Sequence, residues 1–241
     1  MRALSCIVWL GVASGLGCGG GDGDGNKSSS GSTAGPTVAC GQEPTSTGEA
    51  TFYDFADGSG ACGFPATPND LLVGAMNAPD FAGSAPCGAC ARVVGPEGQV
   101  TVRVVDLCPE CPRGNIDLSP EAFALIAPLE RGRVPISWRY VPCDVAGPLK
   151  YHFKDGSNQW WTAIQLRNIR HAVSQLEVEK EGDFVAVPRL DYNYFVAESG
   201  MGPGPLTLRV TDVHSASLTD NSIALGDDAD REGARQFPAC E

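Results

Sequence analysis

Short apolar runs, separated by glycine and proline, dominate the chain between residues 51 and 143. Runs of this length and composition, bounded by turn-forming residues, are typical of strands: Leu71–Met76, Ala91–Val94, Val100–Val105 and Val134–Val141. The segment Gly95-Pro96-Glu97-Gly98 lies between two of them and has the residues of a hairpin turn. We therefore expect a β-rich domain over residues 45–143.

One helix is predicted in this half of the chain. Ser119 is a suitable N-cap, Pro120 occupies the first helical position, and Glu121 favours the positive end of the helix dipole. The apolar face of this helix would comprise Phe123, Ile126 and Ala127, and Gly132 would end the segment.

Residues 149–241 show alternating apolar and polar positions joined by short polar turns. Six runs are predicted to be strands: Leu149–Phe153, Trp161–Leu166, Gln175–Glu179, Phe184–Val187, Tyr192–Val196 and Leu206–Thr211. So many short strands in one segment indicate a small β-sandwich. Residues 144–148 are expected to be a linker between the two domains.

The N-terminal segment predicts export. Arg2 precedes an apolar run, Ala3–Ala13, which is too short to span a bilayer and is typical of a secretory signal over residues 1–17. The small residues before Cys18 resemble a bacterial lipoprotein signal, in which Cys18 is lipidated; ordinary cleavage nearby is the alternative. Residues 18–44 are rich in glycine and serine and are expected to form a flexible tether. We expect a secreted protein or a cell-surface or outer-membrane lipoprotein.

Charge narrows the range of partners. With 42% hydrophobic and 19% charged residues, the composition fits neither a disordered chain nor an integral membrane protein. The formal net charge of −12 argues against nucleic acid, and against acidic polymers or anionic lipid held mainly by charge. Any membrane contact is expected only through the lipid at Cys18.

The cysteines permit two interpretations. Of the 10 cysteines, eight follow Cys6 and Cys18. The motifs Cys87-x-x-Cys90 and Cys108-x-x-Cys111 have the spacing of a four-cysteine zinc site. Export favours disulfides instead, because the compartment is oxidising and the number of remaining cysteines is even. The spacing alone does not choose among the connectivities.

Two aspartates stand out in the densest segment of the first half. Asp106 is predicted at a strand end and Asp117 just before the helix, joined by a loop bounded by cysteines. Aspartates at such places often only cap backbone N–H groups. The functional interpretation is a carboxyl group that faces a groove and donates a hydrogen bond or a proton to a glycosidic oxygen.

Several motifs, in order along the chain, resemble those of a bacterial expansin. They are Gly48–Tyr53, Gly60–Gly63, Cys87–Cys90, Asp106, Asp117–Phe123, Trp138, Ser157–Asn168, Asp191–Phe195 and Gln236–Pro238. The resemblance covers almost everything after residue 45. It implies a six-stranded double-psi β-barrel, related to family-45 glycoside hydrolases, followed by an immunoglobulin-like sandwich that binds carbohydrate. It also implies loosening of cell-wall polysaccharide without detectable hydrolysis.

The resemblance assigns residues to the groove of the barrel. Asp117 matches the essential acidic residue of the family, and Thr51 and Asp106 match residues that line the same groove. Cys108 stands where a well-studied bacterial type has a tyrosine. The resemblance further implies the disulfides Cys62–Cys87 and Cys90–Cys143; the remaining cysteines would then pair as Cys108–Cys111 and Cys40–Cys240.

Hydrolysis would require a second carboxylate. An inverting glycosidase places its acid and its base about 6.5–9.5 Å apart, with a water between them. Related hydrolases carry the base shortly after the motif that Thr51–Tyr53 resembles, and the matching position here is Phe55. Asp54 is the candidate base, but a one-residue offset on a strand turns the side chain to the other face. Asp57 follows three residues later.

A second site is aromatic. Trp160, Trp161 and Tyr192 match the flat platform on which the family stacks glucose rings, and Lys154 matches a flanking position. Tryptophan in a sandwich is otherwise usually part of the core. Neighbouring residues on a regular strand point to opposite faces, so the two indoles share a surface only if a bulge, a strong twist or a loop lies there.

We therefore expect a monomeric, exported expansin-like protein that binds cellulose or a related β-glucan and loosens it without hydrolysis. An endo-β-1,4-glucanase with Asp117 as the acid and Asp54 as the base is one alternative. A polysaccharide-binding protein with a purely structural barrel is another. No cofactor or metal is implied, because His152, His171 and His214 show no ligand or triad spacing.

Overall fold

The computed structural model describes residues 44–54 and 56–239. The predicted signal, the lipidation at Cys18, the tether up to residue 43 and the pair Cys40–Cys240 lie outside the described residues, as does Phe55. Within the described ranges, no helix is long and apolar enough to cross a membrane.

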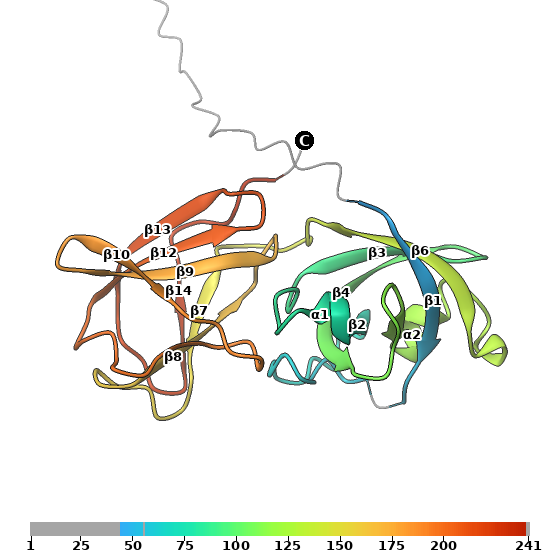
Figure 1. Ribbon diagram of the computed structural model, residues 1–241, viewed down its shortest axis with the longest axis horizontal. Coiled ribbons are helices and arrows are strands. Elements are labelled where there is room, and N and C mark those ends of the chain that lie inside the picture. Colours follow the sequence, from blue (N-terminus) through green and yellow to red (C-terminus); the bar gives the residue numbers. More distant parts are fainter. Residues whose placement is uncertain (1–43, 55, 240–241) are drawn as a thin grey trace, which may run out of the picture. The chain divides into compact units, whose positions relative to one another are not determined.

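Six strands of the first half close into a barrel in the order β1-β5-β2-β4-β3-β6 (Figure 1). β1 runs parallel to β5 and β2 runs parallel to β4, whereas the other neighbours are antiparallel. The strands are β1 (Ser46–Phe52), β2 (Val73–Asn77), β3 (Cys90–Val94), β4 (Gln99–Cys108), β5 (Ile116–Leu118) and β6 (Val134–Val141).

Alternation along the strands builds the barrel core. In β6, Val134, Ile136 and Trp138 are buried whereas Pro135 is exposed, so one face points inward. β2 is buried along its whole length, because it is paired on both sides and covered within the barrel. Trp138 donates from its indole nitrogen to the carbonyl of Gly114 at 2.7 Å, which satisfies its buried polar group.

The helices of the barrel are short. α2 (Pro120–Phe123) begins after Ser119, whose hydroxyl accepts a hydrogen bond from the Ala122 N–H, as predicted. The helix ends earlier than its predicted apolar face, yet Ile126 and Ala127 are still buried in the core. Gly132 follows a separate 3₁₀ helix, η1 (Leu129–Arg131). α1 (Ala78–Phe81), which Asn77 caps, was not predicted.

The second half forms two four-stranded sheets. Their strand orders are β10-β9-β12-β13 and β11-β8-β7-β14. The strands are β7 (Lys150–Phe153), β8 (Thr162–Arg167), β9 (Val173–Lys180), β10 (Asp183–Val187), β11 (Phe195–Ala197), β12 (Leu206–Asp212), β13 (Ser217–Ile223) and β14 (Ala229–Glu232). Large side chains such as Tyr151, Phe153 and Leu176 are fully buried in its own hydrophobic core. The predicted fold class, a six-stranded barrel followed by a sandwich, is confirmed.

Several predicted strands begin one to three residues from their observed starts. At the two aromatic segments, Trp161–Leu166 becomes Thr162–Arg167, and Tyr192–Val196 becomes Phe195–Ala197. In both segments a turn precedes the strand, and Asn193 in the second has a φ of 64°. The aromatic residues that suggested a strand are therefore held on turns.

Three disulfides staple the barrel. They join Cys62 to Cys87, Cys90 to Cys143, and Cys108 to Cys111. The zinc interpretation is therefore wrong, because the cysteines of its first motif are bonded to partners outside that motif. Cys90 and Cys143 lie 53 residues apart in the chain, so this bond removes many conformations of the unfolded barrel.

Side-chain hydrogen bonds join the barrel to the sandwich. Gln165 donates from Nε2 to the carbonyl of Cys62 at 2.9 Å, and Asn193 donates from Nδ2 to the same carbonyl at 3.1 Å. Ser84 donates to the carbonyl of Leu190 at 2.9 Å. These side chains donate to the carbonyl groups of Cys62 and Leu190, which lie outside the strands.

Candidate functional site

Strand pairing brings Thr51 and Asp117 together. They are 66 residues apart in the chain, but they are directly opposite on the parallel strands β1 and β5. The Thr51 hydroxyl donates to Oδ1 of Asp117 at 2.5 Å. The three-residue β5 thus places the carboxyl on the barrel, two residues before the N-cap of α2.

The same row of the barrel continues to Asp106. Ala75 on β2 pairs with Asp117 on one side and with Asp106 on the other. At the usual spacing between strands, the Cα atoms of the two aspartates are roughly 10 Å apart. Ala75, between the two aspartates, carries only a methyl group and is buried. We refer to the row Thr51, Asp117, Ala75 and Asp106 as the carboxyl row.

Asp106 also holds a loop in place. Its Oδ1 accepts hydrogen bonds from the N–H groups of Ala61 at 2.7 Å and of Leu107 at 2.8 Å. A Cβ at Gly60 would lie 2.5 Å from Cβ and Cγ of Asp106, so only glycine permits this close approach. The loop that carries Cys62 is therefore fastened against the carboxyl row.

The environment of Asp117 favours its protonated form. Burial raises the pKa of its carboxyl, and the charge of Asp106 adds to this rise. The hydrogen bond from Thr51 and the charge of Arg133 act in the opposite direction without cancelling it. Asp117 therefore keeps its proton at higher pH than an ordinary carboxyl group does, and it can donate a hydrogen bond.

Tyr53 is a member of this site that the sequence did not single out. Burial raises the pKa of its phenol, as do the charges of Asp106, Asp117 and Asp57. The hydroxyl is buried and has no hydrogen-bond partner among the described residues. Period-two alternation was the available signal, because Tyr53 lies two positions after Thr51 and its N–H continues the pairing to Leu118.

The predicted alternative base is placed differently. Asp54 follows Tyr53 directly in an exposed turn after β1. The pKa of Asp117 responds to the charges of Arg133 and Asp106, and Asp54 is not among the groups that act on it. Asp57 accepts two hydrogen bonds from Ser59, which lower the pKa of its exposed carboxyl.

Cys108 occupies the end of β4 beside the carboxyl row. It is opposite Asn77 of β2 and is bonded to Cys111. The disulfide thus stands where the sequence comparison had suggested a tyrosine contact. It closes the start of the loop that joins Asp106 to Asp117.

The two tryptophans lie on a turn between β7 and β8. Oδ1 of Asn158 accepts the N–H groups of Trp160 at 2.9 Å and of Trp161 at 3.2 Å. This turn removes the strand alternation that would separate the two indoles, as the sequence required. Trp160 is 72% exposed and Tyr192 is 41% exposed.

Tyr194 connects these aromatic residues. Its ring centroid lies 5.7 Å from that of Tyr192, and Trp161 packs against the cluster that contains Tyr194. The ammonium group of Lys154 lies 5.9 Å from the Tyr194 ring centroid. We refer to Trp160, Trp161, Tyr192 and Tyr194 as the aromatic row.

The histidines have other contacts. His152 hydrogen-bonds to Asp230 at 2.8 Å, and His171 stacks edge-on against His214. Across the described residues, no group of three or more His, Cys, Asp and Glu side chains is arranged to hold a metal ion.

Comparisons with known proteins find relatives over most of the chain. A family model described as "Lytic transglycolase" matches residues 45–138. Expansin-YoaJ from Bacillus subtilis is 36% identical over 189 residues, which cover 77% of this chain and 81% of that protein. Expansin-like protein 5 from Dictyostelium discoideum is 31% identical over 175 residues, which cover 68% of this chain and 73% of that protein.

Solved structures are similar over both domains. An apo expansin from Clavibacter michiganensis matches with a TM-score of 0.76 and 31% identity, covering 82% of this chain and all of that chain (100%). A mutant of the Clavibacter expansin in complex with cellohexaose matches with the same TM-score of 0.76.

Proposed function

The chain belongs to the expansin family, and from this premise we propose that it is an exported protein that binds cellulose or a related β-glucan and loosens it without hydrolysis. The observation that carries the proposal is the aromatic row. Trp160 is 72% exposed and Tyr192 is 41% exposed, and large aromatic side chains exposed at a surface indicate an interaction site.

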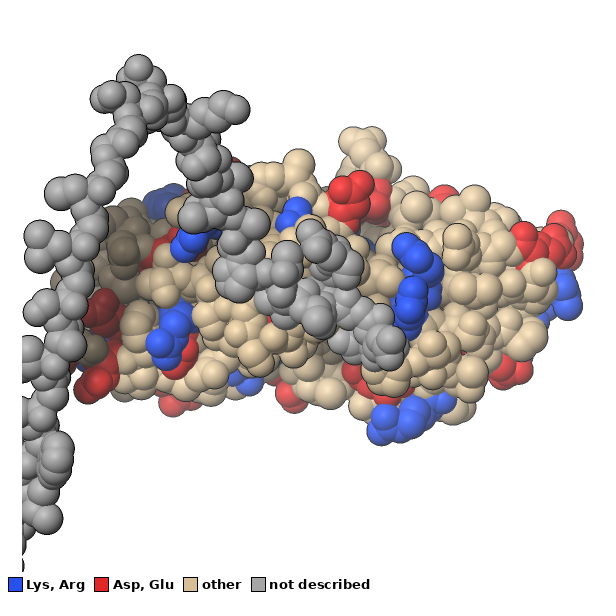
Figure 2. All heavy atoms as spheres, turned by 90° about the horizontal axis from the view of Figure 1, so that it is seen from above, with Lys and Arg blue, Asp and Glu red and all other residues tan. Residues whose placement is uncertain are grey.

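Aromatic rings suit a glucan because glucose rings present faces of C–H groups that stack on them without the need for charge. The cellohexaose bound by the mutant Clavibacter expansin supports a ligand of this class. On the face seen in Figure 2, acidic and basic side chains are interspersed, and most of that surface is neither. With the net charge of −12, this distribution favours a neutral glucan over anionic wall polymers.

The carboxyl row supports loosening without hydrolysis. A protonated Asp117 donates a hydrogen bond to a sugar oxygen and competes with the contacts between glucan chains. Hydrolysis also requires a base that activates water. Asp54 is exposed on a turn, and Oδ1 of Asp106 is occupied by two backbone N–H groups.

The direct test is incubation of the mature protein with amorphous cellulose, with bound protein and released reducing sugar assayed together. The wild type is expected to bind and to release no sugar above the blank. Asp117→Asn and Asp54→Asn are run in parallel. Sugar release that disappears in both variants would establish an endoglucanase instead.

A further inference from the structure

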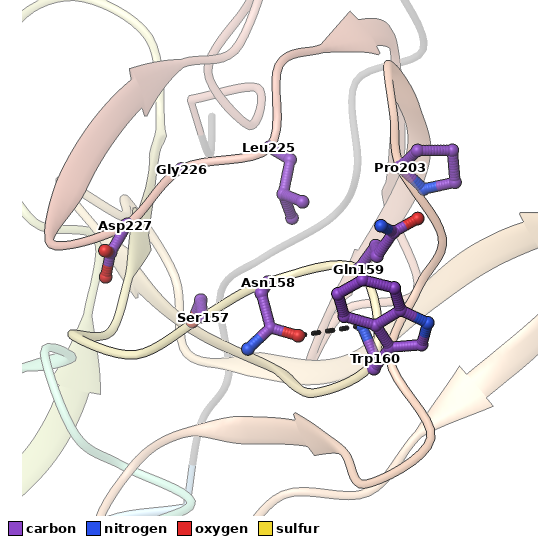
Figure 3. Close-up of a pocket in the computed structure, with 8 residues that line it drawn as sticks. All are labelled: Ser157, Asn158, Gln159, Trp160, Pro203, Leu225, Gly226 and Asp227. Atoms are coloured by element: carbon purple, nitrogen blue, oxygen red, sulfur yellow. Dashed lines mark hydrogen bonds between the residues drawn. The ribbon is translucent and has the colours of Figure 1, made fainter.

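A hollow opens in the sandwich beside Trp160 (Figure 3). Its volume of about 360 Å³ is at the lower end of the range for sites that hold small ligands. Its lining comes from three segments: the turn Ser157, Asn158, Gln159 and Trp160; Pro203; and the loop Leu225, Gly226 and Asp227. Because Trp160 belongs to both, the hollow adjoins the aromatic row.

Hydrogen bonds and packing hold the three segments together. Gly202 donates its N–H to the carbonyl of Gln159 at 3.1 Å, and Gly156 donates to Oδ1 of Asp227 at 2.7 Å. A Cβ at Gly204 would lie 3.4 Å from the Leu225 nitrogen, so the segment after Pro203 packs against the third wall. The hollow is therefore formed before any ligand arrives, which lowers the entropy cost of binding.

The lining combines apolar surfaces with unused polar groups. Trp160, Pro203 and Leu225 provide the apolar part, and in Figure 3 the Leu225 side chain points into the hollow. Gly156 uses one carboxylate oxygen of Asp227. In the part of the chain that is described, the other oxygen and the Gln159 amide have no hydrogen-bond partner.

We propose that this hollow binds one pyranose residue of the glucan whose neighbouring residues lie on the aromatic row. This inference rests on the proposed function and adds a subsite to it. A pyranose ring has apolar C–H faces and a rim of hydroxyl groups. The indole and Leu225 suit the faces, and Asp227 and Gln159 suit the hydroxyls.

Two sources supply such a residue: the next glucose of the glucan backbone, or a sugar branching from it. Both have the chemistry that the lining requires, because both are neutral pyranoses. A linear chain reaches the hollow only when it extends past Trp160. A branch reaches it from a backbone that stays on the aromatic row.

The test compares wild type with a double variant, Gln159→Ala/Asp227→Asn. Asparagine keeps Oδ1 as the acceptor for Gly156, so the loop stays in place. Asp155→Asn is the matched control, because this exposed carboxyl lies in the same turn but outside the lining. Calorimetry measures the affinity for cellotriose through cellohexaose and for a xylose-branched cello-oligosaccharide.

The double variant is expected to lose about tenfold in affinity for the ligands that reach the hollow, and to bind the shorter linear ones as wild type does. Loss confined to the longest linear ligands identifies a backbone residue; loss confined to the branched one identifies a branch. Two results would overturn the subsite but leave the proposed function standing. In one, the double variant binds every ligand with the affinity of wild type; in the other, it loses the same factor in affinity for all of them. If wild type binds none of these oligosaccharides and no insoluble cellulose, the proposed function fails and the subsite fails with it.

Discussion

The carboxyl row and the aromatic row differ in how the fold builds them. Long-range strand pairing assembles the first: Thr51, Asp117, Ala75 and Asp106 come from four strands and meet in one register. A local turn presents the two adjacent tryptophans of the second, and the segment before β11 adds Tyr192 and Tyr194. The first is half-buried, with a raised pKa at Asp117, whereas in the second Trp160 and Tyr192 are exposed and Tyr194 is buried.

This difference assigns different tasks to the two sites. A half-buried carboxyl group whose raised pKa favours its protonated form suits a directional hydrogen bond to one oxygen atom. An exposed row of rings suits tolerant contact with a long, neutral surface. Binding and loosening are therefore expected to be separable by mutation.

The largest effect is expected for Trp160→Ala/Trp161→Ala. Removal of both indoles is predicted to weaken binding to insoluble cellulose by at least about thirtyfold, since exposed aromatic anchors dominate contacts of this kind. A pull-down isotherm measures this loss. Leu125→Ala removes a similarly exposed apolar side chain from the barrel and should leave binding unchanged.

Asp117→Asn is expected to reduce loosening and to leave binding unchanged, the reverse of the double tryptophan variant. Loosening of a cellulose network, measured as mechanical weakening, should fall about tenfold because the acidic O–H donor is replaced by a weaker amide N–H donor. Binding should be unchanged. A parallel loss of binding would mean that the carboxyl row holds the glucan as strongly as the aromatic row does.

Gly60→Ala tests whether the loop positions the carboxyl row. The added methyl would lie 2.5 Å from Asp106, so the loop or the carboxyl must move. We expect loosening to fall about threefold, a loss smaller than that of Asp117→Asn, with binding retained. Gly182→Ala also adds a methyl group at a positive φ, 91° against 155° at Gly60, but in open space, and it serves as the control for backbone strain.

The smallest effect concerns stability and pH. The pKa of Asp117 is raised in the folded protein, so folding favours its protonated form. Its contribution to stability is complete below the unfolded pKa and is lost as pH rises through the higher folded value. Asp117→Asn should therefore raise Tm at pH 7, and by less at pH 3. An equal shift at both pH values would rule out the raised pKa as its cause.

Local patterns in the sequence were sufficient for most of the fold. Apolar runs bounded by glycine and proline predicted much of the barrel and the sandwich, because each buried strand needs such a run. β5 was missed since only Ile116, Asp117 and Leu118 form it, and β13 was missed since its sequence is largely polar. Strands that are this short or this polar are stabilised by pairing with neighbouring strands, and the residues of the strand itself do not predict that pairing.

The candidate sites were predictable to different degrees. The resemblance pointed to Thr51, Asp106 and Asp117, but their common row depends on the order of four strands, which no local pattern contains. Tyr53 was missed as a member of the site although its position two residues after Thr51 places it on the same face of the chain. The need for a bulge, a twist or a loop at Trp160 and Trp161 followed from strand geometry alone, whereas Tyr194 joins them through the tertiary packing of Trp161 against its cluster.

The most direct test of the separation between the two sites is loosening plotted against the amount of bound protein. Wild type, Asp117→Asn and the double tryptophan variant are compared on one cellulose sample over a range of protein concentrations. We predict that the tryptophan variant follows the wild-type curve at low occupancy, whereas Asp117→Asn falls below it at every occupancy. A single curve shared by all three proteins would contradict the account, because binding alone would then explain loosening.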